Sequence, residues 1–204
     1  MGVAALPRRD EESRGRLHEV ARRAAPVTTA GERVLAVPGE LGAVLPGGGV
    51  QRGSVVAVDG SPGAGSTTLM LRLAAAATAA GEWAALVERD ATLGGQAAFE
   101  AGVELERCAV VRWVPRNAWA TVVAALLDGL GLVAAEVPNT ARLADARRLT
   151  ARARERGAVL VVSGPWPAEA ALRLHARGWE DDSLAVAVEG RGAAARPQLT
   201  ALAG

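Results

Sequence analysis

Apolar residues in the middle of the chain form short continuous runs that alternate with segments of helical period. Such runs are typical of strands buried on both faces of a sheet, and the segments between them are typical of covering helices. Strands are predicted at 54–59, 83–88, 109–114, 131–136 and 159–163, and helices at 67–80, 95–101, 118–127 and 140–156. The alternation predicts an α/β fold with a mostly parallel central sheet covered by helices.

The pattern changes after Pro167 to an alternation of apolar and polar residues. It covers 172–176 and 184–188, and the sequence EDDS separates the two parts. This pattern predicts an antiparallel hairpin that closes the sheet, with a helix over 167–177 as the alternative. The segment after the hairpin is rich in small residues and is expected to be a flexible tail.

The N-terminal part is predicted to form a helical arm that needs a surface to pack on. Its apolar residues follow helical spacing: Leu17, Val20, Ala21 and Ala24. A short strand at 33–37 and a glycine-rich segment at 39–53 lead to the first buried strand. We therefore divide the chain into an arm and linker at 1–40, an α/β core at 41–190 and a tail at 191–204.

Composition excludes several classes of protein. The 204 residues are 50% hydrophobic and 22% charged, with a formal net charge of +1. This excludes a mainly disordered chain and leaves no overall field that attracts nucleic acid, so we expect any DNA contact to be weak and local. The early charges at 8–12 lead us to expect no export signal, and Asp128 interrupts the apolar run at 119–137. We expect a cytoplasmic protein that does not bind a membrane.

Residues that commonly bind metals are scarce. The chain has one cysteine, Cys108, and two histidines, His18 and His175. These exclude a disulfide framework and a multi-cysteine metal site, and we predict neither a metal nor a cofactor. Cys108 is expected to be a small buried hydrophobic residue, and the histidines are expected on the surface.

The most informative stretch joins the strand at 54–59 to the helix that follows it. It contains the glycines and hydroxyl residues of a phosphate loop: Gly60, Gly63, Gly65, Ser66, Thr67 and Thr68. A strand, a glycine-rich turn and a helix start form the geometry in which backbone N–H groups surround a phosphate. An ordinary glycine-rich turn between a strand and a helix is the alternative.

Ser66 stands where the phosphate-loop pattern requires lysine. A hydrogen bond to a charged group is worth about 1.5–3 kcal/mol, which corresponds to roughly ten- to a hundred-fold in affinity. A neutral hydroxyl supplies no such charge, so we expect no efficient ATPase activity and no catalytic residue, although Thr67 retains a hydroxyl suited to Mg²⁺. Arg89 and Arg116 are the nearest candidates for a substitute charge.

From Leu41 to Gly190 the chain resembles the RecA-like ATPase core. The run LGAVLPGGGVQRGSVVAVDGSPGAGSTTL is similar to the leucine-rich turn, strand and phosphate loop of that family, and ALVERDATL to its segment with the catalytic glutamate. The resemblance places Asp90 at the catalytic position and Glu136 at or beside the magnesium-binding position. A solvated strand end is the alternative for Glu136. The two DNA-binding loops of the family are replaced here by short connections.

A RecA-like skeleton that lacks the lysine and the loops looks like the ImuA-prime accessory factors of actinobacterial mutasomes. This resemblance implies a non-catalytic adaptor in damage-induced translesion DNA synthesis. It implies binding to an ImuB-type inactive Y-family polymerase homologue, an indirect link to an error-prone C-family DNA polymerase, and a nucleoid-associated location within the repair complex. An ATPase with a deviant loop and an inhibitor of cell division similar to SulA are the alternatives, and self-association stays open.

The remaining candidates are surfaces that contact a partner. On the helix at 140–156 the expected core face consists of Leu143, Ala146, Leu149, Thr150 and Ala153. Another side carries a basic stripe of Arg148, Arg152 and Arg156, which indicates either a solvated face or a docking surface. Trp83 and Trp113 are expected in the core. Trp166 and Trp179 are expected to be exposed and, like the N-terminal helix, are candidates for partner binding.

Overall fold

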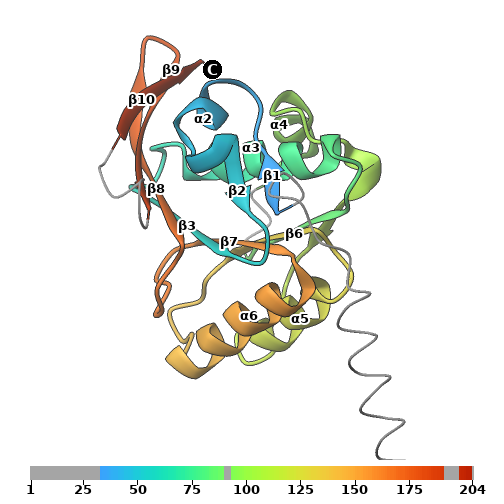
Figure 1. The fold of residues 1–204 in the computed structure, drawn as a ribbon. Helices are drawn as coiled ribbons and strands as arrows, with labels where there is room; N and C mark the ends of the chain where they lie inside the picture. Colours follow the sequence, from blue (N-terminus) through green and yellow to red (C-terminus); the bar gives the residue numbers. More distant parts are fainter. Residues whose placement is uncertain (1–32, 90–92, 191–197, 204) are drawn as a thin grey trace, which may run out of the picture. The chain divides into compact units, whose positions relative to one another are not determined.

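The computed structural model describes residues 33–89, 93–190 and 198–203 (Figure 1). The predicted N-terminal helix lies outside these residues, with Leu17, Val20, Ala21, Ala24 and His18. The acidic residue Asp90 also lies outside them. The described part folds around one large sheet, to which a small two-stranded sheet is added.

Eight strands form the large sheet of the described residues, in the order β10-β9-β8-β3-β7-β6-β4-β5. Neighbouring strands from β8 to β5 are parallel, and β9 and β10 join the other edge in antiparallel orientation. Their bounds are β3 Val55–Gly60, β4 Ala84–Val87, β5 Cys108–Val111, β6 Leu132–Glu136, β7 Val159–Ser163, β8 Leu172–Glu180, β9 Ser183–Gly190 and β10 Gln198–Ala203. The predicted α/β class, the mostly parallel sheet and the antiparallel hairpin of β8 and β9 are confirmed.

Helices cover both faces of this sheet (Figure 1). Helix α3 (Ser66–Ala79) lies on one face, and α5 (Trp119–Leu127) and α6 (Leu143–Arg156) lie on the other. Successive residues of a strand point to opposite faces, so Val56 packs in the core with Leu69 while Val55 packs in the core with Leu149. Because β3 is buried on both faces, it holds the loop that follows it in a fixed place.

Shorter elements complete the described part. Strand β1 (Val34–Ala36) pairs antiparallel with β2 (Gly49–Gln51), and α2 (Gly39–Val44) and the 3-10 helix η1 (Pro46–Gly48) connect them. The predicted strand at 33–37 is therefore confirmed, and the glycine-rich segment contains a helix and a second strand. Helix α4 (Gly95–Glu100) and the 3-10 helix η2 (Leu105–Arg107) lie between β4 and β5.

The C-terminal segment and the start of α6 differ from the prediction. Residues 198–203, expected within a flexible tail, pair with β9 as strand β10, and Leu202 is fully buried. Leu143, expected on the core face of α6, is 43% exposed, whereas Ala146 and Leu149 are buried. Leu143 is the first residue of the helix, so its side chain lies beyond the part of α6 that packs on the sheet.

Candidate functional site

The glycine-rich loop lies between β3 and α3, where the sequence predicts it. Gly60 ends β3, and α3 begins at Ser66 after Gly65, whose φ of 104° is far easier for glycine than for other residues. Inside the loop, the N–H of Ala64 donates to the carbonyl oxygen of Ser61 at 2.9 Å. The loop and the first turn of α3, whose N–H groups have no partner within the helix, line one cleft.

This cleft has a volume of ≈ 580 Å³ and opens at the carboxyl ends of the parallel strands. Its wall includes the loop and the residues that end or follow β3, β4, β6 and β7, together with Trp179 of β8. Ligands of open parallel sheets bind at this edge. The location is therefore suited to a phosphate-bearing ligand, and the charges of the wall decide whether it can hold one.

The charged side chains that line the cleft are acidic. Among the described residues they are Asp59, Glu88 and Glu136, and no lysine or arginine is found among the lining residues. Each of the three carboxylates forms an ion pair with an arginine that does not line the cleft. A triphosphate placed here would meet the backbone N–H groups of the loop and, in the part of the chain that the structure describes, no cationic side chain.

The hydroxyl of Ser66 does not replace the missing charge. Its Oγ is buried and has no hydrogen-bond partner in the part of the chain that the structure describes. A Cβ atom built on Gly60 would lie 2.5 Å from this oxygen, so the hydroxyl lies against the first glycine of the loop. Gly60 is therefore required for space, and the position that the motif reserves for a cation carries none.

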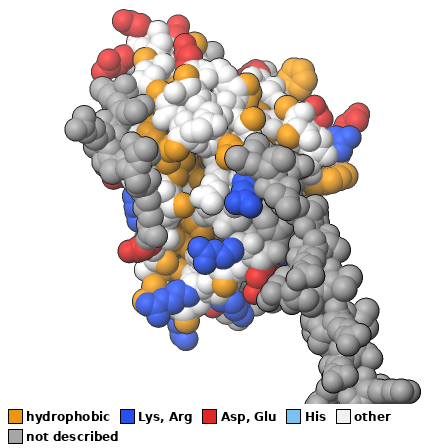
Figure 2. Space-filling view, viewed as in Figure 1, with side chains coloured by type: hydrophobic (Ala, Val, Ile, Leu, Met, Phe, Trp, Pro, Cys, Tyr) orange, Lys and Arg blue, Asp and Glu red, His pale blue; other side chains and the backbone are white. Residues whose placement is uncertain are grey.

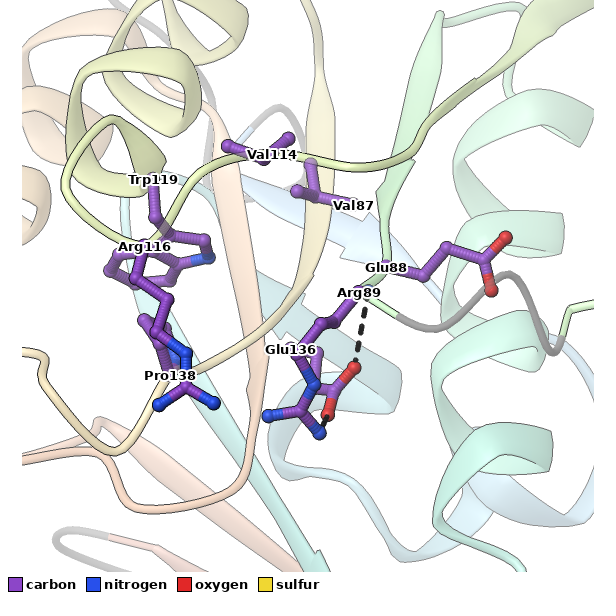
Figure 3. A pocket seen from close by; sticks show the side chains of 8 residues that line it. All are labelled: Val87, Glu88, Arg89, Val114, Arg116, Trp119, Glu136 and Pro138. Carbon is purple, nitrogen blue, oxygen red and sulfur yellow. Dashed lines mark hydrogen bonds and ion pairs between the residues drawn. The ribbon is translucent and has the colours of Figure 1, made fainter.

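Glu136, at the end of β6, is held by Arg89. The Arg89 guanidinium donates to Oε1, and the Arg89 backbone N–H donates to Oε2 at 3.3 Å (Figure 3). Glu136 thus lies at the edge of the sheet that the resemblance implies for a magnesium ligand, beside the cleft. Both of its carboxylate oxygens already accept hydrogen bonds, so a metal ion at this position would have to share the carboxylate with Arg89.

Glu88 is a functional candidate that sequence reasoning missed. It follows β4 directly, is only 5% exposed, and accepts hydrogen bonds from the Arg112 Nε and from the Leu93 N–H at 2.8 Å. The prediction placed the catalytic carboxylate two residues later, at Asp90. The signal was present in the sequence, since Glu88 is the first polar residue after an apolar run. Its ion pair with Arg112 makes it a structural residue in this conformation.

The two arginines proposed as substitute charges do come close to the cleft. Arg89 and Arg116 both line a smaller pocket that shares Val87, Glu88 and Glu136 with the cleft wall. The Arg89 guanidinium forms an ion pair with the Glu136 carboxylate. Neither arginine lines the cleft itself.

The basic stripe of α6 is compensated by acidic residues. Arg152 and Arg156 both pair with Asp128 at the end of α5, Arg152 also pairs with Glu155, and Arg148 pairs with Asp145. Figure 2 shows arginine side chains in the lower part of the face, the region where α6 lies in Figure 1. The ion pairs favour the interpretation of this stripe as a solvated helix face that also ties α5 to α6.

Arg152→Gln should raise the pKa of Asp128. That pKa lies below the ordinary value for an aspartate, chiefly because the Arg152 side chain donates a hydrogen bond to the carboxylate. The ion pair therefore stabilises the fold at pH values above the ordinary aspartate range, and this contribution is lost as the pH falls through the lowered pKa. An NMR titration of the Asp128 carboxyl measures the change. Arg148→Gln is the control and should leave the Asp128 titration as it is.

The tryptophans are placed differently from the prediction at three of four positions. Trp83 and Trp113, expected in the core, are 50% and 74% exposed. Trp166, expected on the surface, is 8% exposed and packs in the core between the sheet and α6. Trp179 is 44% exposed, as predicted, and lines the cleft. Trp166 is therefore withdrawn as a partner contact, and Trp179 stays a candidate.

Cys108, the one cysteine of the chain, and His175 are both partly buried. Cys108 is half-buried, and burial raises the pKa of its thiol. His175 is not a free surface residue, because its Nδ1 lies 3.9 Å from Asp59 and its Nε2 lies 3.4 Å from Glu189. Within residues 33–89, 93–190 and 198–203, no group of three or more His, Cys, Asp or Glu side chains is arranged to hold a metal ion.

None of the helices within the described residues combines the length and the apolar character that a membrane span requires. The apolar run at 119–137 is divided between α5 and β6, as predicted.

Comparison with known proteins gives one family. A family model described as the MT3502 N-terminal domain matches residues 43–168, a range that includes the glycine-rich loop, Glu88 and Glu136. No curated protein matches the chain.

Proposed function

The chain belongs to the family described as the MT3502 N-terminal domain, a description that names no activity, and from its own site we propose that it is a non-catalytic accessory protein. It keeps the loop of a RecA-like core and acts by binding protein partners. We propose further that it serves in a mutasome for translesion DNA synthesis, in contact with an ImuB-type polymerase homologue and, through it, with an error-prone C-family polymerase.

One observation carries the non-catalytic part of this proposal. The cleft that would bind ATP is lined by three carboxylates and no basic side chain among the described residues. Enzymes that transfer phosphoryl groups place cations and Mg²⁺ where negative charge develops, and they depend on this stabilisation for most of their rate. Here the lysine position is Ser66, and the carboxylate of Glu136 accepts hydrogen bonds from Arg89 on both oxygens.

The order of strands supports a RecA-like core. The strand that carries the loop, β3, lies inside the sheet between β7 and β8, and the chain crosses it on the way from the carboxyl end of β7 to the amino end of β8. This is a topological switch point, where doubly wound sheets bind nucleotides. Short connections support the absence of DNA-binding loops, since β6 and α6 are joined by 137–142 and β7 and β8 by 164–171.

A nucleotide-binding function with an arginine as the substitute cation is the second candidate. It is favoured by the position of Arg116, which lines the pocket beside the cleft and forms no ion pair within the described residues. A conformational change that moved Arg116 into the cleft would supply one positive charge. The accessory function is preferred because it needs no such rearrangement.

Co-purification tests the proposed partner. The full chain, co-expressed with an ImuB-type polymerase homologue from the same genome, should co-purify with it whether or not ATP and Mg²⁺ are present. Trp179→Ala should weaken the complex, because exposed tryptophans are common at the centres of interfaces. Trp83→Ala is the matched control, since Trp83 is similarly exposed but precedes β4 at the opposite edge of the sheet. A complex that forms only with ATP, or one that forms instead with the tubulin-like cell-division protein, would contradict the proposal.

A further inference from the structure

A small pocket lies beside the cleft, between the carboxyl end of β4 and the start of α5 (Figure 3). Its volume is ≈ 20 Å³, which is enough for one water-sized group and too small for a nucleotide. Its apolar wall includes Val87, Val114 and Pro138. The connection from β5 to α5 brings Arg116 and Trp119 to the same pocket.

Trp119 supplies a hydrogen-bond donor without an acceptor. The side chain is 4% exposed, and its indole Nε1 is buried with no partner in the part of the chain that the structure describes. In Figure 3 the nitrogen-bearing edge of the ring is turned toward the Arg89–Glu136 pair. Buried indole N–H groups normally have a partner. The orphaned donor therefore indicates an acceptor atom that comes from outside the chain.

The charges around the pocket favour an anionic acceptor. Arg89 and Glu136 neutralise each other, and the carboxylate of Glu88 points away from the pocket and pairs with Arg112 (Figure 3). Arg116 lines the pocket and has no ion pair among the described residues. The two uncommitted polar groups, the Trp119 N–H and the Arg116 guanidinium, are both donors, and the guanidinium is positively charged.

We propose that this pocket binds a single carboxylate group. One carboxylate oxygen, the water-sized group that the ≈ 20 Å³ volume admits, would accept from the Trp119 Nε1–H. The rest of the group would lie outside this volume, where its negative charge would pair with the exposed Arg116. The carboxylate comes either from an acidic residue of a partner protein or from a small free acid. The inference rests on the pocket alone and stands whether or not the proposed function is right.

NMR of the ¹⁵N-labelled full chain tests the proposal. The five tryptophans give five indole N–H signals, and Trp119→Phe identifies the signal of Trp119. Titration with sodium acetate at constant ionic strength should shift this signal saturably and leave the other four in place. Acetamide, which is similar in size but neutral, should shift it far less. Arg116→Gln should weaken the apparent affinity for acetate at least about tenfold, because a charge-assisted hydrogen bond is lost.

The control variant is Arg147→Gln, an exposed arginine of α6, which should bind acetate as the unchanged chain does. The other four indole signals report that each variant is folded. A blocked peptide with one internal glutamate distinguishes the two sources: tighter binding than acetate indicates a partner protein, and equal or weaker binding indicates a free acid. The proposal is overturned if acetate produces no saturable shift, if acetamide acts equally, or if Arg116→Gln binds acetate unchanged.

Discussion

Gly65→Ala should lower the free energy of unfolding by about 2–5 kcal/mol, the sum of a backbone term and a packing term. The backbone term arises because Gly65 has a φ of 104°, which residues with a Cβ rarely adopt. The packing term arises because a Cβ at this position would overlap Cδ1 of Leu184 in β9. Leu184 is fully buried, so it cannot move aside without disturbing its neighbours.

Urea unfolding followed by tryptophan fluorescence measures this loss. Gly129→Ala is the matched control, because a Cβ there meets no atom within 4 Å and the backbone is not in the left-handed region. That variant should change stability by no more than about 0.5 kcal/mol. If Gly65→Ala were equally harmless, the loop would not be held against β9 as the structure shows, and the cleft would not have the described shape.

This result would also show that the loop needs no bound phosphate to keep its conformation. Gly60 leaves space for the Ser66 hydroxyl, and Gly65 allows the close approach of Leu184. Both glycines are thus required by contacts inside the protein, independent of any phosphate. A loop kept for packing can lose its nucleotide without losing its conformation.

Local patterns predicted most elements of the core because the strands are buried on both faces. The continuous apolar runs at 54–59, 131–136 and 159–163 correspond to β3, β6 and β7 within about one residue at each end. The glycine-rich loop between β3 and α3 was placed correctly for the same reason, since its signal is a local sequence of glycines between a strand and a helix. Strand β10 was missed because alternating small residues give little contrast between its two faces.

The state of the site depends on contacts that no local pattern contains. Glu136 and Arg89 are 47 positions apart, and they meet because β4 and β6 are adjacent in the sheet. Trp83 precedes β4 and Trp113 follows β5. The exposure of these two side chains likewise depends on where the two strands lie in the sheet. Sequence reasoning correctly placed Glu136 at the carboxyl edge of the sheet. It could not show that the Glu136 carboxylate is paired with Arg89.

Ser66→Lys provides the sharpest test of the missing charge. The unchanged chain should show no saturable binding of ATP and Mg²⁺ by calorimetry at micromolar concentrations, and it should release no phosphate. The variant should bind ATP roughly ten- to a hundred-fold more tightly, because a lysine at the start of α3 restores a charged hydrogen bond to the phosphates. It should still not hydrolyse ATP, since Arg89 continues to hold Glu136.

Ser61→Lys separates the position from the charge. Ser61 lies in the same loop and lines the same cleft, so this variant adds an equal charge away from the start of α3 and should improve ATP affinity much less. Arg89→Ala combined with Ser66→Lys would free Oε1 of Glu136, while the backbone N–H of residue 89 would still donate to Oε2. Magnesium should then strengthen ATP binding by the double variant more than by Ser66→Lys alone. Micromolar binding with turnover by the unchanged chain would instead mean that another cation enters the cleft, and Arg116→Gln should then abolish that turnover if this arginine is the source.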